Sequence, residues 1–250
     1  MKRPDRGENA MQNRYTGDIG DFGKLGLLRK LHSAGLSIGV NWYLTPDETH
    51  NGDGQHIEYL QKESFAECDR PLWIELKQLV ESGRREVTVL QNDAILQARF
   101  FSAPLDFNNK PKTERETIRR MWHKTALHRL SGCDIVFVDP DNGLITPSAE
   151  GTPKSNKYVY PFELLDYYKR GASVIYYQHK ARRPDSVYAE QHQQLISAFG
   201  FYDAKSIGLK FKTTSQRYYF FIVQHDHKDC INKTVKEMLS TAWGKHFEWI

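Results

Sequence analysis

Residues 134–143, Asp-Ile-Val-Phe-Val-Asp-Pro-Asp-Asn-Gly, contain the pattern that decides the fold class. The first half is a short apolar run rich in β-branched residues, which is typical of a strand buried on both faces. The second half is made of turn residues, since Pro fixes φ, Asp and Asn bond to nearby backbone, and Gly allows positive φ. We therefore predict a buried strand over 134–138 that ends in a polar turn.

Helices and strands alternate on both sides of this strand. After it we predict helix 161–169, strand 172–177, helix 185–199, strands 204–211 and 217–224, and helix 231–242. Before it we predict helix 21–33, strand 36–44, helix 71–81, strand 86–91 and helix 113–130. Strands that alternate with helices pair in parallel through right-handed crossovers. We predict an α/β fold, a Rossmann-like three-layer sandwich with a mostly parallel sheet and an antiparallel C-terminal edge hairpin.

The composition fits one folded domain over residues 1–250, with residues 1–13 as an N-terminal extension. Apolar residues make up 39% of the chain and charged residues 26%, which is a globular composition. No apolar run has the length of a membrane span, and the N-terminus lacks the apolar segment of a signal peptide. The three cysteines are far apart without a CxxC pair. We therefore expect a cytoplasmic protein without a membrane partner.

Basic residues gather in two segments, although the formal net charge is only +4. The first cluster is Lys110, Lys112, Arg115, Arg119, Arg120 and Lys124, and the second is Lys180, Arg182 and Arg183. Such patches attract phosphates, so a nucleic acid or a phosphorylated small molecule is a candidate partner. The alternative is a solvated helix face and a basic surface loop. The oligomeric state stays open.

The chemistry is expected in the loops that follow the strands. In open α/β sheets, ligands bind beyond the carboxyl ends of the strands, where the strand order reverses. Two carboxylates and an amide at the end of a buried strand are costly when they serve nothing. The predicted catalytic residues are Asp139, Pro140, Asp141, Asn142 and His179, and Lys180, Arg182 and Arg183 are predicted to bind substrate through phosphate or carboxylate groups.

The strand followed by Asp139-Pro140 resembles the D/N/S-P-P-Y/F/W motif of amino-methyltransferases. The resemblance implies that Asp139 accepts a hydrogen bond from the target amine, and that the Pro140 carbonyl is a second acceptor. Asp141 and Asn142 stand where that family has a proline and an aromatic residue.

A second resemblance covers the N-terminal half. Residues 15–18, Tyr-Thr-Gly-Asp, lead through Lys24 into a predicted helix, a strand to Leu44 and a polar loop. This order is similar to bacterial ribosomal-RNA adenine-N6 methyltransferases of the class I superfamily, which bind S-adenosylmethionine (SAM). The predicted cofactor-binding residues are Asp18, Lys24, Thr45, Asp47, Glu48, Gly52, Gly54 and Asp93. The predicted aromatic substrate contacts are Tyr15, Tyr158 and Tyr160.

Glycine recurs at every third position from Gly17 to Gly26. Each glycine inside a helix costs about 1 kcal/mol relative to alanine. The repeat therefore indicates a close backbone approach, either by another element of the fold or by a ligand. Asp18 and Asp21 have an equally good structural explanation as helix N-caps.

Three functional hypotheses remain open. The first is a SAM-dependent methyltransferase, or a methyltransferase-like protein, acting on an amine of a nucleic acid or nucleotide. The second is a Mg²⁺-dependent nuclease or phosphohydrolase that uses the Asp139 and Asp141 carboxylates. The third is a non-catalytic Rossmann-like module that binds nucleic acid.

Overall fold

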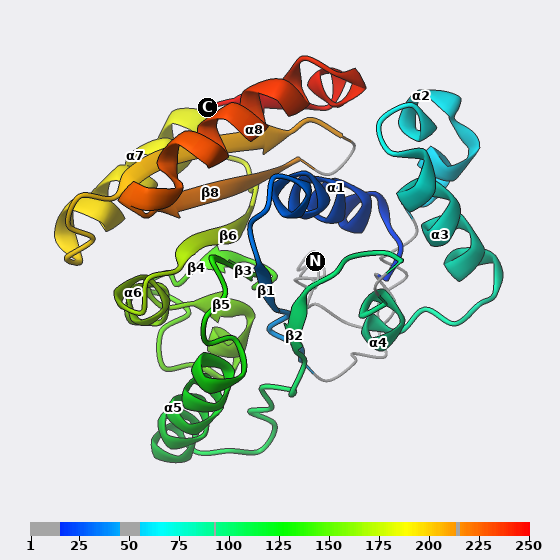
Figure 1. The fold of residues 1–250 in the computed structure, drawn as a ribbon. Coiled ribbons are helices and arrows are strands. Elements are labelled where there is room, and N and C mark those ends of the chain that lie inside the picture. Colours follow the sequence, from blue (N-terminus) through cyan, green and yellow to red (C-terminus); the bar gives the residue numbers. More distant parts are fainter. Residues whose placement is uncertain (1–15, 46–55, 93, 214–215) are drawn as a thin grey trace.

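The computed structural model describes residues 16–45, 56–92, 94–213 and 216–250, and these form a mixed α/β fold. Figure 1 shows helices on both sides of a twisted sheet. The helices are α1 (Ile19–Ser33), α2 (Glu63–Ala66), α3 (Arg70–Glu81), α4 (Val87–Leu90), α5 (Lys112–Arg129), α6 (Pro161–Lys169), α7 (Asp185–Ala198) and α8 (Lys228–Leu239). The strands are β1 (Ile38–Asn41), β2 (Arg99–Phe101), β3 (Ile135–Val138), β4 (Gly143–Leu144), β5 (Tyr158–Val159), β6 (Ser173–His179), β7 (Lys205–Phe211), β8 (Arg217–Val223) and β9 (Phe247–Trp249).

The large sheet has seven strands in the order β2-β1-β3-β6-β8-β7-β9. β1 pairs in parallel with β2 and β3, and β3 pairs in parallel with β6. β8 is antiparallel to both β6 and β7, and β9 is antiparallel to β7. The prediction of an α/β fold with a large, mostly parallel sheet is thus confirmed.

The predicted edge hairpin lies inside the sheet, which corrects its expected place. β8 inserts between β6 and β7, and β9 forms the edge beyond β7. The sequence of β8, Arg-Tyr-Tyr-Phe-Phe-Ile-Val, is buried at every position. A strand with apolar residues facing both ways needs cover on both faces and neighbours on both sides, so it belongs in the interior.

The strand order reverses between β1 and β3. The chain leaves β1 for β2 on one side, and then returns through α5 to β3 on the other side of β1. Ligands of open α/β sheets bind beyond the carboxyl ends of the strands at such a point. The residues that follow Asn41 and Val138 therefore stand at the place where a ligand is expected.

In the first half one predicted strand is wrong and one strand was not predicted. The predicted strand over 86–91 is instead the short helix α4, Val87–Leu90. The strand beside β1 is β2, which begins at Arg99 and has an exposed, an intermediate and a buried residue in succession. A three-residue edge strand carries too little hydrophobic pattern to be recognised, whereas the Val-Thr-Val-Leu run of α4 has the composition of a strand.

The two faces of the sheet carry separate apolar cores. Ile135 and Phe137 of β3 pack into the core with α1, α3 and α8. Val136 and Val138, which alternate with them, pack into the core with α5 and α6. Among the described residues, no helix is both long and apolar enough to cross a membrane.

The buried face of α5 includes polar side chains. Met121 is 67% exposed, while Arg119 and His123 are buried. Arg119 and His123 of α5 are bonded to Glu163 and Asp166 of α6, respectively.

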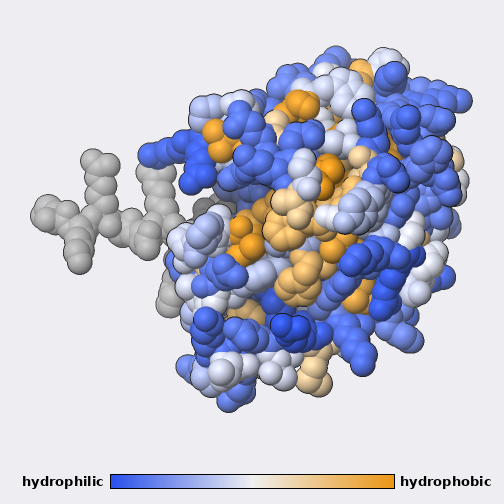
Figure 2. Space-filling model, turned by 90° about the vertical axis from the view of Figure 1, so that its left-hand side faces the viewer, coloured by the Kyte–Doolittle hydropathy of each residue, from blue (hydrophilic) through white to orange (hydrophobic). Residues whose placement is uncertain are grey.

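Apolar side chains gather in the middle of the molecular face on the α5, α6 and α7 side (Figure 2). Phe162 of α6, 41% exposed, is one of the large apolar side chains left open to solvent.

The glycine repeat of α1 serves close packing within the fold. A Cβ at Gly20 would overlap the Arg217 guanidinium, and one at Gly23 would lie 2.7 Å from the Phe211 ring. A Cβ at Gly26 would overlap the Trp243 indole. Helix α1 therefore lies against β7, β8 and the segment after α8 at a distance that only glycine allows. Another element of the fold, rather than a ligand, meets these three positions.

We expect Gly26→Ala to destabilise the protein by about 1–3 kcal/mol, because the added methyl group must displace a fully buried indole. Helix propensity alone predicts the opposite sign, a gain of about 1 kcal/mol. Urea unfolding measures the difference. Ser33→Ala, at an exposed position of the same helix, is the control and should change stability by less than about 0.5 kcal/mol. A Gly26→Ala protein more stable than the wild type would contradict the packing argument.

His192 of α7 is a buried polar contact between the helix and the sheet. Its side chain is 1% exposed. Nδ1 lies 3.0 Å from the Tyr176 hydroxyl and Nε2 lies 3.2 Å from the Phe221 carbonyl oxygen. Burial lowers the pKa of His192 to about 4, although the bond to Phe221 opposes this. The neutral imidazole is therefore part of the folded core.

The protein should become less stable as the pH is lowered from 7 to 4, because His192 is neutral in the folded state. Between pH 6.5 and about 4 the unfolded chain binds a proton that the folded chain does not, which destabilises the folded state. At about 1.36 kcal/mol per pKa unit, the loss is on the order of 3 kcal/mol. We expect the stability advantage of wild type over His192→Gln to shrink by this amount between pH 7 and pH 4, as measured by urea unfolding. Gln194→Ala, at an exposed position of the same helix, should show no such pH dependence; equal behaviour of the two variants would refute the assignment.

Candidate functional site

The centre of the candidate site is a buried ion pair between α1 and the end of β3. Lys24 Nζ lies 2.5 Å from Asp139 Oδ2 and 3.0 Å from Asp21 Oδ1. The three side chains are between 2% and 6% exposed. The contact joins α1 to the Asp139-Pro140 turn, and Lys24 and Asp139 are 115 residues apart in the chain.

The start of α1 explains why these groups meet. Asp18 is the N-cap, and its carboxylate accepts from the backbone N–H groups of Gly20 and Asp21 at 2.7 and 3.0 Å. Asp21 accepts from Gly17 N–H at 2.7 Å, and Gly17 has φ +84°. The predicted cofactor residue Asp18 thus caps the helix, as the structural alternative expected.

Charges in the cluster shift each other's ionisation. Burial by itself would lower the pKa of Lys24, but the negative charges of Asp139 and Asp21 outweigh burial and raise it. Burial raises the pKa of Asp21 to about 6 against the opposing charge of Lys24, and it also raises the pKa of Asp139. Lys24 is therefore a fixed positive charge whose removal would leave buried carboxylates uncompensated.

Aromatic and basic side chains enclose the pair from the sheet. Lys24 Nζ lies 5.4 Å from the ring centroid of Trp42, which follows β1. Arg217, at the start of β8, is 6% exposed and lies against Gly20, and its charge acts on Tyr177, Asp18 and Tyr219. No local pattern in the sequence indicates a role for Arg217. Its place follows from the pairing of β8 with β6, and Gly20 opposite it is the one indication of a large neighbour.

Four polar atoms on β8 and on the segments that leave β1 and β3 have no hydrogen-bond partner within the described part of the chain. They are Trp42 Nε1, Thr45 Oγ1, Asn142 Nδ2 and Tyr219 Oη, each enclosed. Two of these residues follow β1, and Asn142 follows β3. Native proteins satisfy most buried polar atoms, so a group of unsatisfied ones points to a missing water, ion or ligand.

The backbone is strained at the same point. Tyr43, the second residue after β1, has φ +47°, a conformation that costs a non-glycine residue of order 1–3 kcal/mol. Its hydroxyl donates to Glu163 at 3.1 Å and its ring packs edge-on against Trp122. Residues held in this way cluster at functional sites, and Tyr43 fixes the path of the chain toward Thr45.

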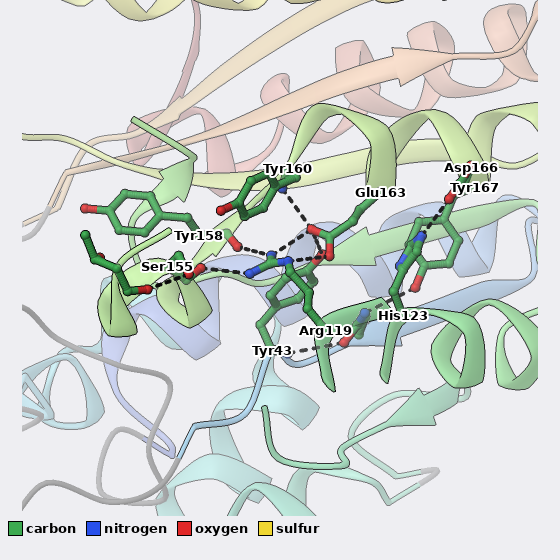
Figure 3. A network of polar contacts seen from close by, with 11 residues as sticks. Tyr43, Arg119, His123, Ser155, Tyr158, Tyr160, Glu163, Asp166 and Tyr167 are labelled. Atoms are coloured by element: carbon green, nitrogen blue, oxygen red, sulfur yellow. Dashed lines mark hydrogen bonds and ion pairs between the residues drawn. The ribbon is translucent and has the colours of Figure 1, made fainter. Parts of the chain in front are cut away.

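Glu163 belongs to a second polar network, which supports the segment after the Asp139 turn. In Figure 3 the Arg119 guanidinium lies between Glu163 and the backbone of that segment. Arg119 binds Glu163 at 2.8 Å through both Nε and Nη2, and it donates to the carbonyls of Ser155 and Tyr158. Arg119 is therefore not part of the predicted basic surface patch, because a buried arginine paired with a carboxylate is not accessible to phosphate.

The predicted tyrosines are fixed by the same network. Tyr158 is 9% exposed, and the Arg119 guanidinium lies 4.3 Å from the ring centroid of Tyr160. The backbone N–H of Tyr160 donates to Glu163 at 2.8 Å. Both tyrosines thus have structural roles at the start of α6, and their contact with substrate stays a prediction.

The second basic segment is partly neutralised. Lys180 binds Asp185, the first residue of α7, and Lys210 Nζ lies 2.6 Å from the same carboxylate. Hydrogen bonds from these lysines hold the pKa of Asp185 well below its usual range. Arg182 and Arg183 are exposed. The prediction of a free phosphate-binding group therefore fits the two arginines better than Lys180.

His179 ends β6 beside the cluster. Its Nδ1 lies 3.3 Å from the Tyr177 hydroxyl, and it pairs with Arg217 across the β6–β8 ladder. Burial, and then the charge of Arg217, lowers the pKa of His179, so the imidazole is neutral at pH 7. Its predicted catalytic role remains a prediction.

Several predicted site residues lie outside the described residues. These are Tyr15, Asp47, Glu48, Gly52, Gly54 and Asp93. The strand predicted over 86–91, which Asp93 follows in the sequence, is the helix α4. The residue that follows the real second strand is Ser102.

Comparisons with known proteins add little to this geometry. No family model matches the sequence, and no curated protein matches it. Among solved structures, protein LPL1258 from Legionella pneumophila, of the family DUF519, superposes with a TM-score of 0.47 at 10% identity, over 94% of this chain and 96% of that chain. A likeness at this level carries no inference about activity.

Lys24→Met should destabilise the protein by about 3–5 kcal/mol, because it leaves the Asp139 and Asp21 carboxylates buried without their partner. The double variant Lys24→Met/Asp139→Asn should regain part of this loss, since one of the two charges is then absent. Urea unfolding at pH 7 measures both. Lys233→Met, at a side chain that is 77% exposed, is the matched control. A Lys24→Met protein with wild-type stability would show that the ion pair does not form.

Proposed function

We propose that this chain binds SAM beyond the carboxyl ends of β1 and β3 and transfers its methyl group to an amine of a nucleic acid or nucleotide. The observation that carries the proposal is the set of enclosed polar atoms on the segments that leave β1 and β3, which have no hydrogen-bond partner among the described residues. These segments begin where the strand order reverses and where Lys24 meets Asp139. That is the place where open α/β sheets bind ligands.

The strand order supports the proposal. The order β2-β1-β3-β6-β8-β7, with β8 antiparallel to its neighbours, resembles a class I methyltransferase sheet that lacks its outermost strand on the β2 side. β9 adds a strand at the other edge. We also propose that the fold is a Rossmann-like three-layer sandwich.

The two segments that resemble methyltransferase motifs also meet. Lys24 of the N-terminal helix bonds directly to Asp139 of the Asp-Pro turn. Thr45 and Asn142, on the loops that leave β1 and β3, have hydrogen-bonding atoms available for a ligand. Bound SAM would supply an electrophilic methyl group, and the chain would supply polar acceptors and alignment for the amine.

The fit is weaker at the ribose. A dinucleotide- or nucleoside-binding strand of this class usually ends in an acid that holds the ribose hydroxyls. β2 is followed by Ser102, and the next acid, Asp106, accepts from Asn108 N–H at 2.8 Å. A serine hydroxyl can also bond a ribose hydroxyl, so Ser102 takes the acid's place in this proposal.

The Asp139 geometry does not favour the Mg²⁺ hypothesis. A hard divalent cation needs several oxygen ligands, whereas the Asp139 carboxylate is bonded to the Lys24 ammonium. Within the described ranges, no group of three or more His, Cys, Asp or Glu side chains is placed to hold a metal ion.

Isothermal titration with SAM and S-adenosylhomocysteine (SAH), without added metal, tests the proposal. We expect micromolar binding to the wild type. Thr45→Val should weaken it about tenfold, because a buried hydroxyl that bonds the ligand is lost. The matched control is Thr117→Val on the exposed side of α5, which should bind like the wild type.

Absence of both binding heat and a thermal shift would refute the methyltransferase proposal. Titration with Mg²⁺ and Mn²⁺, with a nuclease assay, would then test the carboxylate hypothesis. Tight binding of single-stranded nucleic acid without SAM binding would instead favour the non-catalytic module.

A further inference from the structure

Gln178 of β6 fixes the turn that follows Asp139. Its Nε2 donates to the Asn142 carbonyl at 2.8 Å, and its Oε1 accepts from Leu144 N–H at 3.0 Å. One carboxamide therefore binds the backbone on both sides of Gly143. This is the pairing that an adjacent strand would make, supplied by a side chain.

Gly143 is required at the centre of this clamp. Its φ is +95°, and a Cβ at this position would overlap the Gln178 carboxamide. The turn is held from its other side as well, since Asn142 N–H donates to the Lys157 carbonyl at 3.1 Å and Gly143 pairs in parallel with Tyr158. The backbone of Asn142 is thus fixed from two directions.

The side chain on this rigid backbone is unsatisfied. Asn142 Nδ2 is enclosed and has no hydrogen-bond partner among the residues that the structure describes. Asp139, three residues earlier, differs, because its carboxylate is bonded to Lys24. Asp139 Oδ2 is therefore already engaged by a buried ammonium, whereas Asn142 Nδ2 has no bond within the described residues to give up when a ligand binds.

We propose that Asn142, and not Asp139, contacts the acceptor amine, and that Gln178 is the positioning residue that orients Asn142. This inference rests on the proposed function. A carboxamide carries an acceptor and a donor side by side. It therefore matches an amino group next to a ring nitrogen, as on the edge of adenine or cytosine. The substrate class is accordingly a nucleobase with such an edge.

Methyl transfer from tritiated SAM to mixed-sequence single-stranded RNA and DNA oligonucleotides tests the proposal, with SAH affinity measured in parallel. Asn142→Ala should lower kcat about 100-fold, in the range found when one preorganised polar group is removed, while the Kd for SAH changes less than twofold. Asn142→Asp keeps the acceptor and loses the donor, so it should raise KM about tenfold. Asn108→Ala, at an exposed asparagine, is the control.

A double-variant cycle separates positioning from mere stability. Gln178→Ala should lower kcat about tenfold with unchanged SAH affinity, since Asn142 is then present but poorly oriented. Combined with Asn142→Ala it should cause no further loss, because Gln178 acts through Asn142. The matched control is Gln193→Ala, whose side chain bonds Ser206 on the surface.

The outcomes are distinguishable. Wild-type kcat in Asn142→Ala, together with a large loss in Asp139→Asn, would overturn the inference and leave the proposed function intact. Multiplying losses in the double variant would overturn the role of Gln178. SAH binding without transfer to any oligonucleotide would refute the nucleobase acceptor, and absence of SAH binding would refute the proposed function and this inference with it.

Discussion

Lys24 reaches from the second turn of α1 to the carboxylate of Asp139 at the end of β3, and the geometry of the whole site depends on that contact. Both charges are buried, so removing either one destabilises the folded state by leaving the other without its partner. The pair fixes where α1 lies over the sheet. It also determines which groups at the carboxyl ends of the strands are already occupied and which are open to a ligand.

The glycine repeat makes the ion pair possible. Without side chains at Gly20, Gly23 and Gly26, α1 approaches Arg217, Phe211 and Trp243 directly. At that distance a lysine side chain spans the gap to β3 while its stem remains buried. The cost of glycine in a helix, about 1 kcal/mol each, is offset by burial of three large side chains. Local propensity is overridden here by packing.

Two polar networks hold the long segment between β3 and α6. Gln178 clamps its beginning at Asn142, and the Arg119–Glu163 pair holds its end at Tyr158. Both networks fix backbone rather than side chains, so the turn after Asp139 is rigid. On this rigid turn, Asn142 Nδ2 has no hydrogen-bond partner among the described residues, which is the arrangement expected where a ligand must be aligned.

The sequence by itself determined the strongly patterned elements. The apolar runs of β3, β6 and β8 and the periodic helices α3, α6 and α7 were found close to their true bounds, because each carries a full hydrophobic pattern within one segment. It also located the Asp139 turn, since turn residues after a buried strand are a local signal. The tertiary structure alone decided that β8 lies between β6 and β7, that 87–90 is helical, and that the basic Arg119 is buried. It alone showed that Lys24 is bonded to the Asp139 carboxylate and that the Gln178 side chain binds the backbone of Asn142. These facts depend on contacts between residues far apart in the chain, and neither spacing nor composition records which distant side chains will meet.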